Sequence, residues 1–526
     1  MTPETIISNA LIVDGGGGAP LHGDLAMGED GLILGVGTNL PRTGVPQLID
    51  AKGLTLAPGF IDVHSHSDIS LMAAPDAIGK ISQGVTSEIV GNCGLSCFPV
   101  SDRNRSHLQE LWENYGIEIS WDDFSSYASA FERRQPVTNV SSLCGHNTLR
   151  SSVLGYGNEP FGRSELDAMC EALHSCLSQG AAGFSTGLLY VPGKFSKTEE
   201  LAALLRVIAP SSKPYTTHMR SEGDGLLEAL DEAIGIALSS AAPKLHVSHL
   251  KTSGKRNWSK LGQALEKLAA ARDAGLSVTA DRYPYTESMT SLSIVLPPPY
   301  GDLDDVTLQN TLSTPAAFLD LINKLAENPA RDIGATRLVS TAAAKFSEFA
   351  GQKLSEIGSA LKMPPARVCA EILRADASGA RAAFSGMSPE NMHDILCQDF
   401  VCCGSDESAR GLGYEYGRSH PRGFGSFPRF FGIVRERFGL PEAVRRMSSL
   451  PAQTFGLSKR GFLAPGFAAD LVLFSPDEFS STADFSRPHI PAKGISRVWV
   501  NGVLSYGEGR VVARAGRFLR NQNRHP

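Results

Sequence analysis

The sequence predicts an α/β protein: a TIM-like (β/α)8 barrel with a small β-sandwich formed by both termini and an insertion after the seventh barrel strand. Three observations support this fold class. Short apolar runs alternate with amphipathic helical segments through the middle of the chain. Residues that bind metals follow several of these runs directly. The two ends of the chain share a pattern of β runs broken by glycine.

Eight strand-like runs are candidates for the barrel. They begin at Phe60, Glu88, Asn139, Ala182, Pro214, Lys244, Leu276 and Phe400. Helical patterns lie between several of them, over Ser164–Gln179, Lys197–Ile208, Gly225–Ser239 and Leu261–Ala274. This alternation favours βαβ units and a parallel sheet, so we expect residues 58–459 to form the barrel.

The two termini are predicted to form one small domain. Residues 1–57 contain TIISNALIVDG and GLILGVG, and residues 460–526 contain AADLVLFSP and VWVNGVLS. Runs of this kind separated by glycine turns are typical of β-strands. We therefore expect both ends to pack together as a β-sandwich.

The gap between the last two strand candidates is too long for one crossover. It contains LPPPYGD and several helical stretches, and we interpret at least residues 286 to about 345 as an insertion. Long insertions at a barrel mouth often act as lids or specificity loops.

Composition excludes several classes of protein. The chain has 526 residues, with 49 basic and 55 acidic side chains and a net charge of −6, which gives no basic face for nucleic acid. No apolar run is long enough to span a bilayer, and the first residues do not resemble a signal peptide. Nine cysteines without regular spacing favour reduced thiols and a cytoplasmic location. We expect a monomer or a small homo-oligomer.

Potential metal ligands lie at the C-terminal ends of the strand-like runs. Each of GFIDVHSH, SEIVGNC, PYTTHMR, KLHVSHL and FVCCGSD ends on or near such residues, namely His64, His66, Cys93, His218, His249 and Asp406. Because the carboxyl ends of barrel strands converge on one mouth, these side chains are expected to meet there. The pattern predicts a hydrolytic metal centre.

Each ligand also has a structural interpretation. Cys93 alone is more often a buried core cysteine, His218 and His249 are each compatible with core histidines, and Asp406 suits a helix N-cap. The joint occurrence at equivalent strand ends favours the metal site. His246 falls on the opposite face of its strand from His249 and is expected to be structural.

Several longer motifs carry a family resemblance. They include APGFIDVHSHSD, GVTSEIVGNCGLS, GAAGFSTGLLYVPG, THMRSEG, VSHLKTSGKRNW and HPRGFGSFPR, within a resemblance running from about residue 5 to 510. The chain resembles the amidohydrolase superfamily and, more closely, its N-acyl-D-amino-acid deacylases (D-aminoacylases). This implies zinc-dependent hydrolysis of an N-acyl-D-amino acid to a carboxylate and a free D-amino acid. Similar proteins often have SDG where this chain has Asp406-Glu407.

The resemblance also implies roles for the ligands. Cys93, His218 and His249 would hold one tightly bound Zn²⁺, a set of thiolate and imidazoles that suits zinc. His64, His66 and Asp406 would form a second site that is weak or empty. Asp406 would move the proton, and His66, from the HxH pair, would help to stabilise the oxyanion.

The substrate's α-carboxylate requires donors near the metal. By resemblance these are Lys251, Tyr283 and Ser288, although Lys251 alone would suit a solvated strand end. His420 and Arg422 could be structural or could contact substrate. The segment after Ser288, MTSLSIVLPPPY, contains no arginine or lysine, which favours apolar amino acids over acidic ones. Arginines in the loops after Asp406 oppose this expectation: Arg410, Arg418 and Arg422.

Three other functions fit the same fold. A cyclic-amide hydrolase of the dihydroorotase or hydantoinase type would use a modified lysine on a middle strand, but STG at 185–187 offers none. A non-enzymatic scaffold would usually lack several ligands, and a deaminase would not need donors for a carboxylate. Only the resemblance favours D over L substrates.

Overall fold

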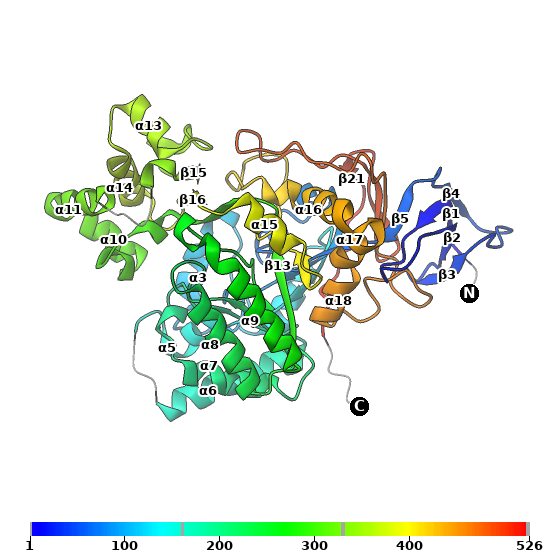
Figure 1. Cartoon of the computed structure of the whole chain (residues 1–526), viewed down its shortest axis with the longest axis horizontal. Helices are drawn as coiled ribbons and strands as arrows, with labels where there is room; N and C mark the ends of the chain where they lie inside the picture. The colour runs from blue at the N-terminus through cyan, green and yellow to red at the C-terminus, as the bar shows by residue number, and fades with distance from the viewer. Residues whose placement is uncertain (1–2, 159–161, 328–331, 522–526) are drawn as a thin grey trace.

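The computed structural model describes residues 3–158, 162–327 and 332–521. A β-sheet made from both termini lies at one end of the molecule, and the insertion lies at the other (Figure 1). The barrel occupies the space between them. No helix in the described ranges is long and apolar enough to cross a membrane.

Parallel strands form the barrel in the order in which they occur along the chain. Strand β8 continues into β9, so that they make one barrel strand. The strands are β6 (Phe60–Asp62), β7 (Val85–Val90), β8 (Asn139–Ser142), β9 (Cys144–Gly145), β10 (Phe184–Gly187), β11 (Pro214–His218), β12 (Lys244–Val247), β13 (Ser277–Arg282) and β17 (Val401–Cys403). A parallel bridge between Ser65 and Glu407 joins the last strand to the first. The predicted barrel is confirmed, and every strand begins within three residues of its predicted start.

Helices surround the barrel strands, which are therefore buried on both faces. Those predicted from periodicity are α6 (Arg163–Gln179), α7 (Thr198–Ile208), α8 (Leu226–Ser239) and α9 (Leu261–Asp273). The others are α1 (Ser70–Ala73), α2 (Ile78–Ile81), α3 (Arg105–Leu111), α4 (Phe124–Glu132), α5 (His146–Leu154), α15 (Pro389–Leu396), α16 (Arg422–Phe438), α17 (Leu440–Met447) and α18 (Ser449–Phe455).

Strands from both termini share one nine-stranded sheet. Its members are β1 (Thr5–Ile12), β2 (Leu21–Met27), β3 (Ile33–Gly37), β4 (Gln47–Asp50), β5 (Thr55–Pro58), β18 (Leu471–Phe474), β19 (Ile495–Val500), β20 (Val503–Gly507) and β21 (Arg510–Val511). The antiparallel pair β5–β18 joins the two ends of the chain. Side chains alternate between faces: Leu471 and Leu473 pack in the sheet's own core, whereas Val472 and Phe474 join the barrel core.

The chain beyond the sheet returns to the barrel, which differs from the expected 460–526 domain. Phe518 pairs with Val140 of β8, and its ring packs edge-on against Phe124 and Tyr127. The Leu519 amide donates to the Val140 carbonyl at 2.6 Å. Burial of Phe518 against the barrel wall explains why this segment leaves the sheet. Residues 1–2 and 522–526 of the predicted domain lie outside the described residues.

The insertion is longer than the predicted range of 286–345. It contains α10 (Asp305–Leu312), α11 (Pro315–Ala326), α12 (Ala344–Ser347), α13 (Leu354–Leu361) and α14 (Pro365–Ala375), with the strands β14 (Glu287–Ser291), β15 (Arg337–Ser340) and β16 (Arg381–Ser385). These elements enclose a hydrophobic core of their own. Because β16 pairs antiparallel with β14, the insertion ends near Ser385. Residues 328–331 of the predicted range lie outside the described residues.

Candidate metal centre

The six predicted ligands meet at the carboxyl ends of the barrel strands. The Cys93 Sγ lies 3.3 Å from the His64 Nε2 and 3.4 Å from the His249 Nε2. The Asp406 Oδ1 lies 3.2 Å from the His66 Nε2. Three sets of potential ligand atoms each fall within 4.8 Å of one another: His64, His66 and Cys93; Cys93, His218 and His249; and His64, His249 and Asp406. The arrangement is a compact cluster of thiol, imidazole and carboxylate groups.

Three of these residues adopt backbone conformations that are unusual for non-glycine residues. The φ angles are 52° at Cys93, 35° at His249 and 52° at Asp406. Each occurs where the chain leaves a barrel strand and turns across the mouth. Strain of this kind persists when surrounding contacts fix the backbone, and it concentrates at functional sites.

Glycines make room for the turn that carries Cys93. Gly91 and Gly94 both have positive φ, at 75° and 76°. A Cβ on Gly187, at the end of β10, would lie only 1.9 Å from the Cys93 carbonyl oxygen. The motifs GNCG and STG therefore belong to one structural unit, in which the end of β10 packs directly against the Cys93 turn.

The surroundings of His218 show how well these residues suit a metal ion. Its side chain is buried, yet both ring nitrogens lack a hydrogen-bond partner among the described residues. Buried polar atoms normally have partners, so a buried imidazole without a hydrogen bond, beside a thiol, has the surroundings expected of a metal ligand. Burial alone would raise the pKa of the Cys93 thiol, but the charges of His64 and His249 lower this pKa well below its usual value. A thiolate beside imidazoles fits a zinc ion.

Asp281, near the end of β13, contacts His64, His246 and His249. Its Oδ2 lies 3.0 Å from the His64 Nδ1 and 3.0 Å from the His246 Nε2, and its Oδ1 accepts the backbone amide of His249. A proton on the His64 Nδ1 leaves Nε2 free to face the cluster. His246 also contacts Thr279 and lies in the core, in agreement with the structural role predicted for it. The role of Asp281 was not predicted from the sequence.

Asp406 pairs with a buried arginine. Its Oδ2 lies 2.9 Å from the Arg422 Nη1. Burial alone would raise the pKa of the Asp406 carboxyl, but the charge of Arg422 holds this pKa well below its ordinary value. The carboxylate is therefore ionised at neutral pH. His420 has a structural place instead, since its Nδ1 accepts the backbone amide of Arg422 at 3.0 Å.

Glu407, the departure from the SDG pattern, is turned toward the backbone. Its Oε2 accepts the His420 amide at 3.1 Å, and its Oε1 accepts the Ser408 amide at 3.0 Å. Both carboxylate oxygens are used in holding the loop that comes after Asp406.

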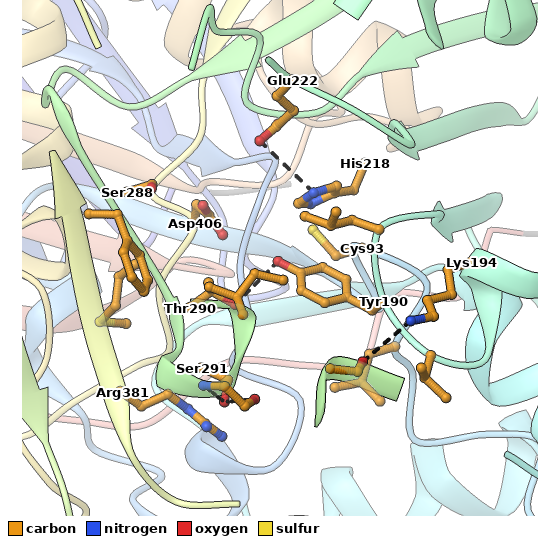
Figure 2. A pocket seen from close by; sticks show the side chains of 18 of the residues that line it. Cys93, Tyr190, Lys194, His218, Glu222, Ser288, Thr290, Ser291, Arg381 and Asp406 are labelled. Carbon is orange, nitrogen blue, oxygen red and sulfur yellow. Dashed lines mark hydrogen bonds and ion pairs between the residues drawn. The ribbon is translucent and has the colours of Figure 1, made fainter. Parts of the chain in front are cut away.

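The predicted carboxylate-binding residues lie around the same opening. The Lys251 Nζ lies 6.0 Å from the centre of the Tyr283 ring, and Arg422 covers that ring at 4.5 Å. Lys251 also forms an ion pair with Glu222, a residue whose role was not predicted from the sequence. Ser288 comes from β14 of the insertion and, like Asp406, lines the same opening (Figure 2).

A single cavity of about 1680 Å³ contains these groups and is lined by both the barrel mouth and the insertion. The Tyr190 hydroxyl lies 3.3 Å from the Thr290 Oγ1, and the Lys194 Nζ donates to the Asp302 Oδ1 at 2.6 Å. These contacts join the loop after β10 to the insertion (Figure 2). The insertion therefore forms one wall of the cavity.

The cavity is lined by an arginine that the prediction of an apolar wall did not consider, Arg381. That prediction rested on the segment after Ser288, with Arg410, Arg418 and Arg422 weighed against it. Strand β16 pairs with this segment and brings Arg381 opposite Ser291, beside the cavity. Arg410, Arg418 and Arg422 also line it. The cavity therefore has cationic groups near the hydroxyl-bearing side chains of β14, as Figure 2 shows for Arg381.

Comparison with known proteins identifies the family. The model of the amidohydrolase family matches residues 47–331 and 424–506, and the chain belongs to this family. The N-acyl-D-glutamate and N-acyl-D-aspartate deacylases of Alcaligenes xylosoxydans xylosoxydans are both 32% identical to it, over 98% of this chain and 96% and 95% of theirs. The D-aminoacylase of the same organism is 31% identical over 97% of this chain and 98% of its own. Within the family, the chain is a member of the N-acyl-D-amino-acid deacylase branch.

Solved structures agree with this placement. The N-acyl-D-glutamate deacylase of Bordetella bronchiseptica, in complex with zinc and a phosphonate that mimics the tetrahedral intermediate, has a TM-score of 0.83 at 30% identity. The match covers 99% of this chain and all of that one. A D-aminoacylase with a binuclear metal centre has a TM-score of 0.82 at 29% identity, with the same coverage. The L-hydantoinase of Arthrobacter aurescens, at 16% identity and a TM-score of 0.54, shares the fold.

Proposed function

We propose that this protein hydrolyses the amide bond of N-acyl-D-amino acids in a zinc-dependent reaction that releases a carboxylic acid and a free D-amino acid. The observation that carries the proposal is the convergence of Cys93, His218 and His249 with Asp406 beside one cavity. The activities of the relatives named above supply the substrate class.

The metal would be held by Cys93, His218 and His249, in one tight site. His64, His66 and Asp406 would form a second, weaker site. Zinc bound at the tight site supplies Lewis-acid chemistry: it lowers the pKa of a water molecule and polarises the amide carbonyl. The unpaired ring nitrogens of His218 and the acidified thiol of Cys93 support this assignment.

Asp406 would act as the general base and then as the general acid. Its carboxylate is ionised, because Arg422 favours the charged form, so it can accept the proton of the attacking water. The same carboxyl would then deliver the proton to the leaving amine. His66, 3.2 Å from Asp406, is only partly buried and would donate to the oxyanion.

Recognition of the α-carboxylate would depend on Lys251, Tyr283 and Ser288. We propose that Arg422 joins this set, because its guanidinium lies over the ring of Tyr283 and lines the cavity. Three buried cations lie by the Tyr283 ring, namely Lys251, Arg282 and Arg422, and they form a favourable environment for an anionic group. A linear N-acyl amino acid carries such a group next to the scissile amide.

Cyclic-amide hydrolysis is less well supported. Strand β10 ends in Phe184–Gly187, and it offers no lysine that a modified, metal-bridging ligand would require. Gly187 also packs too closely against Cys93 to be replaced by a larger residue. The residues of β10 therefore favour a linear amide over a cyclic amide as the substrate.

We also propose a cytoplasmic location, a small-molecule substrate, and a monomeric or small homo-oligomeric state. All nine cysteines are unpaired in the structure, and most are buried, which suits a reducing compartment.

The proposal can be tested with matched N-acetyl-D- and N-acetyl-L-amino acids in the presence of added zinc. Release of free amine from the D series, well above that from the L series, is the expected result. Dihydroorotate and a hydantoin serve as cyclic controls. Turnover of a cyclic amide without turnover of the D series would contradict the proposal.

A further inference from the structure

Glu222 contacts both the cluster of proposed metal ligands and the proposed carboxylate-binding lysine. It lies in the loop between β11 and α8, four residues after His218. Its Oε1 lies 2.7 Å from the His249 Nδ1, and the same oxygen accepts from the Lys251 ammonium. Its Oε2 lies 3.9 Å from the His218 Nε2. One carboxylate therefore adjoins two proposed zinc ligands, as Figure 2 shows for His218.

The ring nitrogen that carries the proton of His249 determines which nitrogen of this residue can bind a metal. The His249 Nε2 faces the Cys93 thiol at 3.4 Å, so it is the nitrogen directed at the cluster. A neutral imidazole that binds a metal through Nε2 carries its proton on Nδ1, which must then donate. Lys251 lies 2.8 Å from Nδ1, but an ammonium has only protons to donate. Glu222 is the acceptor at hand.

We propose that Glu222 is a positioning residue: it fixes the tautomer of His249 that binds zinc, and it anchors Lys251 at the edge of the same site. This inference rests on the zinc site of the proposed function. It ties the metal and the donor for the substrate carboxylate to one side chain, so both groups keep their places relative to each other.

A similar pair elsewhere in the barrel offers a control. The His146 Nε2 lies 2.8 Å from the Glu200 Oε1, and both side chains are fully buried. Neither residue lines the cavity. Glu200→Gln therefore removes a buried carboxylate from a histidine and leaves the proposed metal ligands unchanged.

The experiment measures zinc affinity rather than turnover. Metal-free full-length protein is titrated with zinc against a chromophoric chelator, for the wild type and for Glu222→Gln, Lys251→Met and Glu200→Gln. Loss of a carboxylate behind a ligating histidine commonly weakens metal binding by about 10- to 100-fold, and this is the effect expected for Glu222→Gln. Glu200→Gln should bind zinc as the wild type does, and Lys251→Met, which keeps the Glu222 carboxylate on His249, should lose much less affinity than Glu222→Gln.

A double variant guards against an indirect effect. Glu222→Gln leaves a buried ammonium without its partner, which by itself can disturb the fold. Glu222→Gln combined with Lys251→Met removes that ammonium and should still bind zinc weakly. Wild-type affinity in either Glu222→Gln protein would overturn the inference. Absence of zinc binding by the wild type would instead overturn the proposed function.

Discussion

In this site, neighbouring side chains determine the protonation and charge of the proposed ligands and of the proposed base. Asp281 orients His64, Glu222 faces His249, and Arg422 keeps Asp406 ionised. His64, His249 and Asp406 thus each have a charged partner on the side away from the ligand cluster. The chemistry of the site depends on these pairs as much as on the metal-facing atoms.

Replacing Asp406 by asparagine tests the proton transfer. Asp406→Asn should keep the fold and the tightly bound zinc, because Cys93, His218 and His249 remain. Turnover should fall by about 10²- to 10⁴-fold, since an amide cannot carry the proton. Steady-state rates and metal analysis on the same preparation provide the measurement.

Glu407→Gln is the matched control for this change. Its carboxylate holds backbone amides and not the cluster, so a much smaller effect on rate is expected. Near-normal rates in Asp406→Asn, together with a large loss in Glu407→Gln, would move the base to Glu407.

Replacing Lys251 by methionine tests carboxylate recognition. Lys251→Met should lower kcat/KM for N-acetyl-D-amino acids by roughly 10- to 100-fold, because a charge-assisted hydrogen bond contributes about 1.5–3 kcal/mol. Analogues with a neutral α-amide should be affected much less. Equal losses for both kinds of substrate would show that Lys251 does not hold the carboxylate.

At the scale of the element, the ends of the strands make the site possible. The Cys93 turn lies against the end of β10, and β16 pairs with β14 to complete one wall of the cavity. Neither contact involves residues that are close in sequence. Both can be tested by substitutions outside the ligand set.

Gly187→Ala should disturb the Cys93 turn. The added Cβ would meet the Cys93 carbonyl oxygen at 1.9 Å, and backbone would have to move. We expect a loss of about 1–3 kcal/mol in stability, the usual cost of overpacking, together with lower zinc content.

Gly235→Ala is the control for that substitution. It lies within α8, and its Cβ would meet nothing within 4 Å. Alanine favours a helix over glycine by about 1 kcal/mol, so this variant should be at least as stable as the wild type. Zinc content equal to the wild type in Gly187→Ala would refute the proposed link between β10 and Cys93.

Arg381→Met tests the cationic side of the cavity wall. If Arg381 faces the substrate side chain, this change should lower kcat/KM for N-acetyl-D-glutamate by roughly tenfold and leave N-acetyl-D-leucine almost unchanged. The ratio of the two values, before and after substitution, is the measurement. An unchanged ratio would restore the apolar wall expected from the segment after Ser288.

At the scale of the whole molecule, hydrophobic periodicity and the candidate ligands at strand ends predicted the barrel. Contacts between distant segments could not be inferred from the sequence. Alternating helices and strands fix the order of βαβ units, and the residues just after each strand gather at the mouth. Nothing local distinguishes Asp281 or Glu222 from other acids, since their roles come from neighbouring strands. The return of Phe518 to the barrel and the pairing of Arg381 with Ser291 likewise join segments far apart in the chain.

The measurement that tests the central claim most directly is the zinc content of purified protein and three variants. Cys93→Ala and His249→Ala each remove one of three proposed ligands. Cys369→Ala removes a buried cysteine from the core of the insertion, away from the cavity. We predict about one tightly bound zinc per chain in the wild type and in Cys369→Ala, and its loss from the other two. Wild-type zinc content in both Cys93→Ala and His249→Ala would contradict the account.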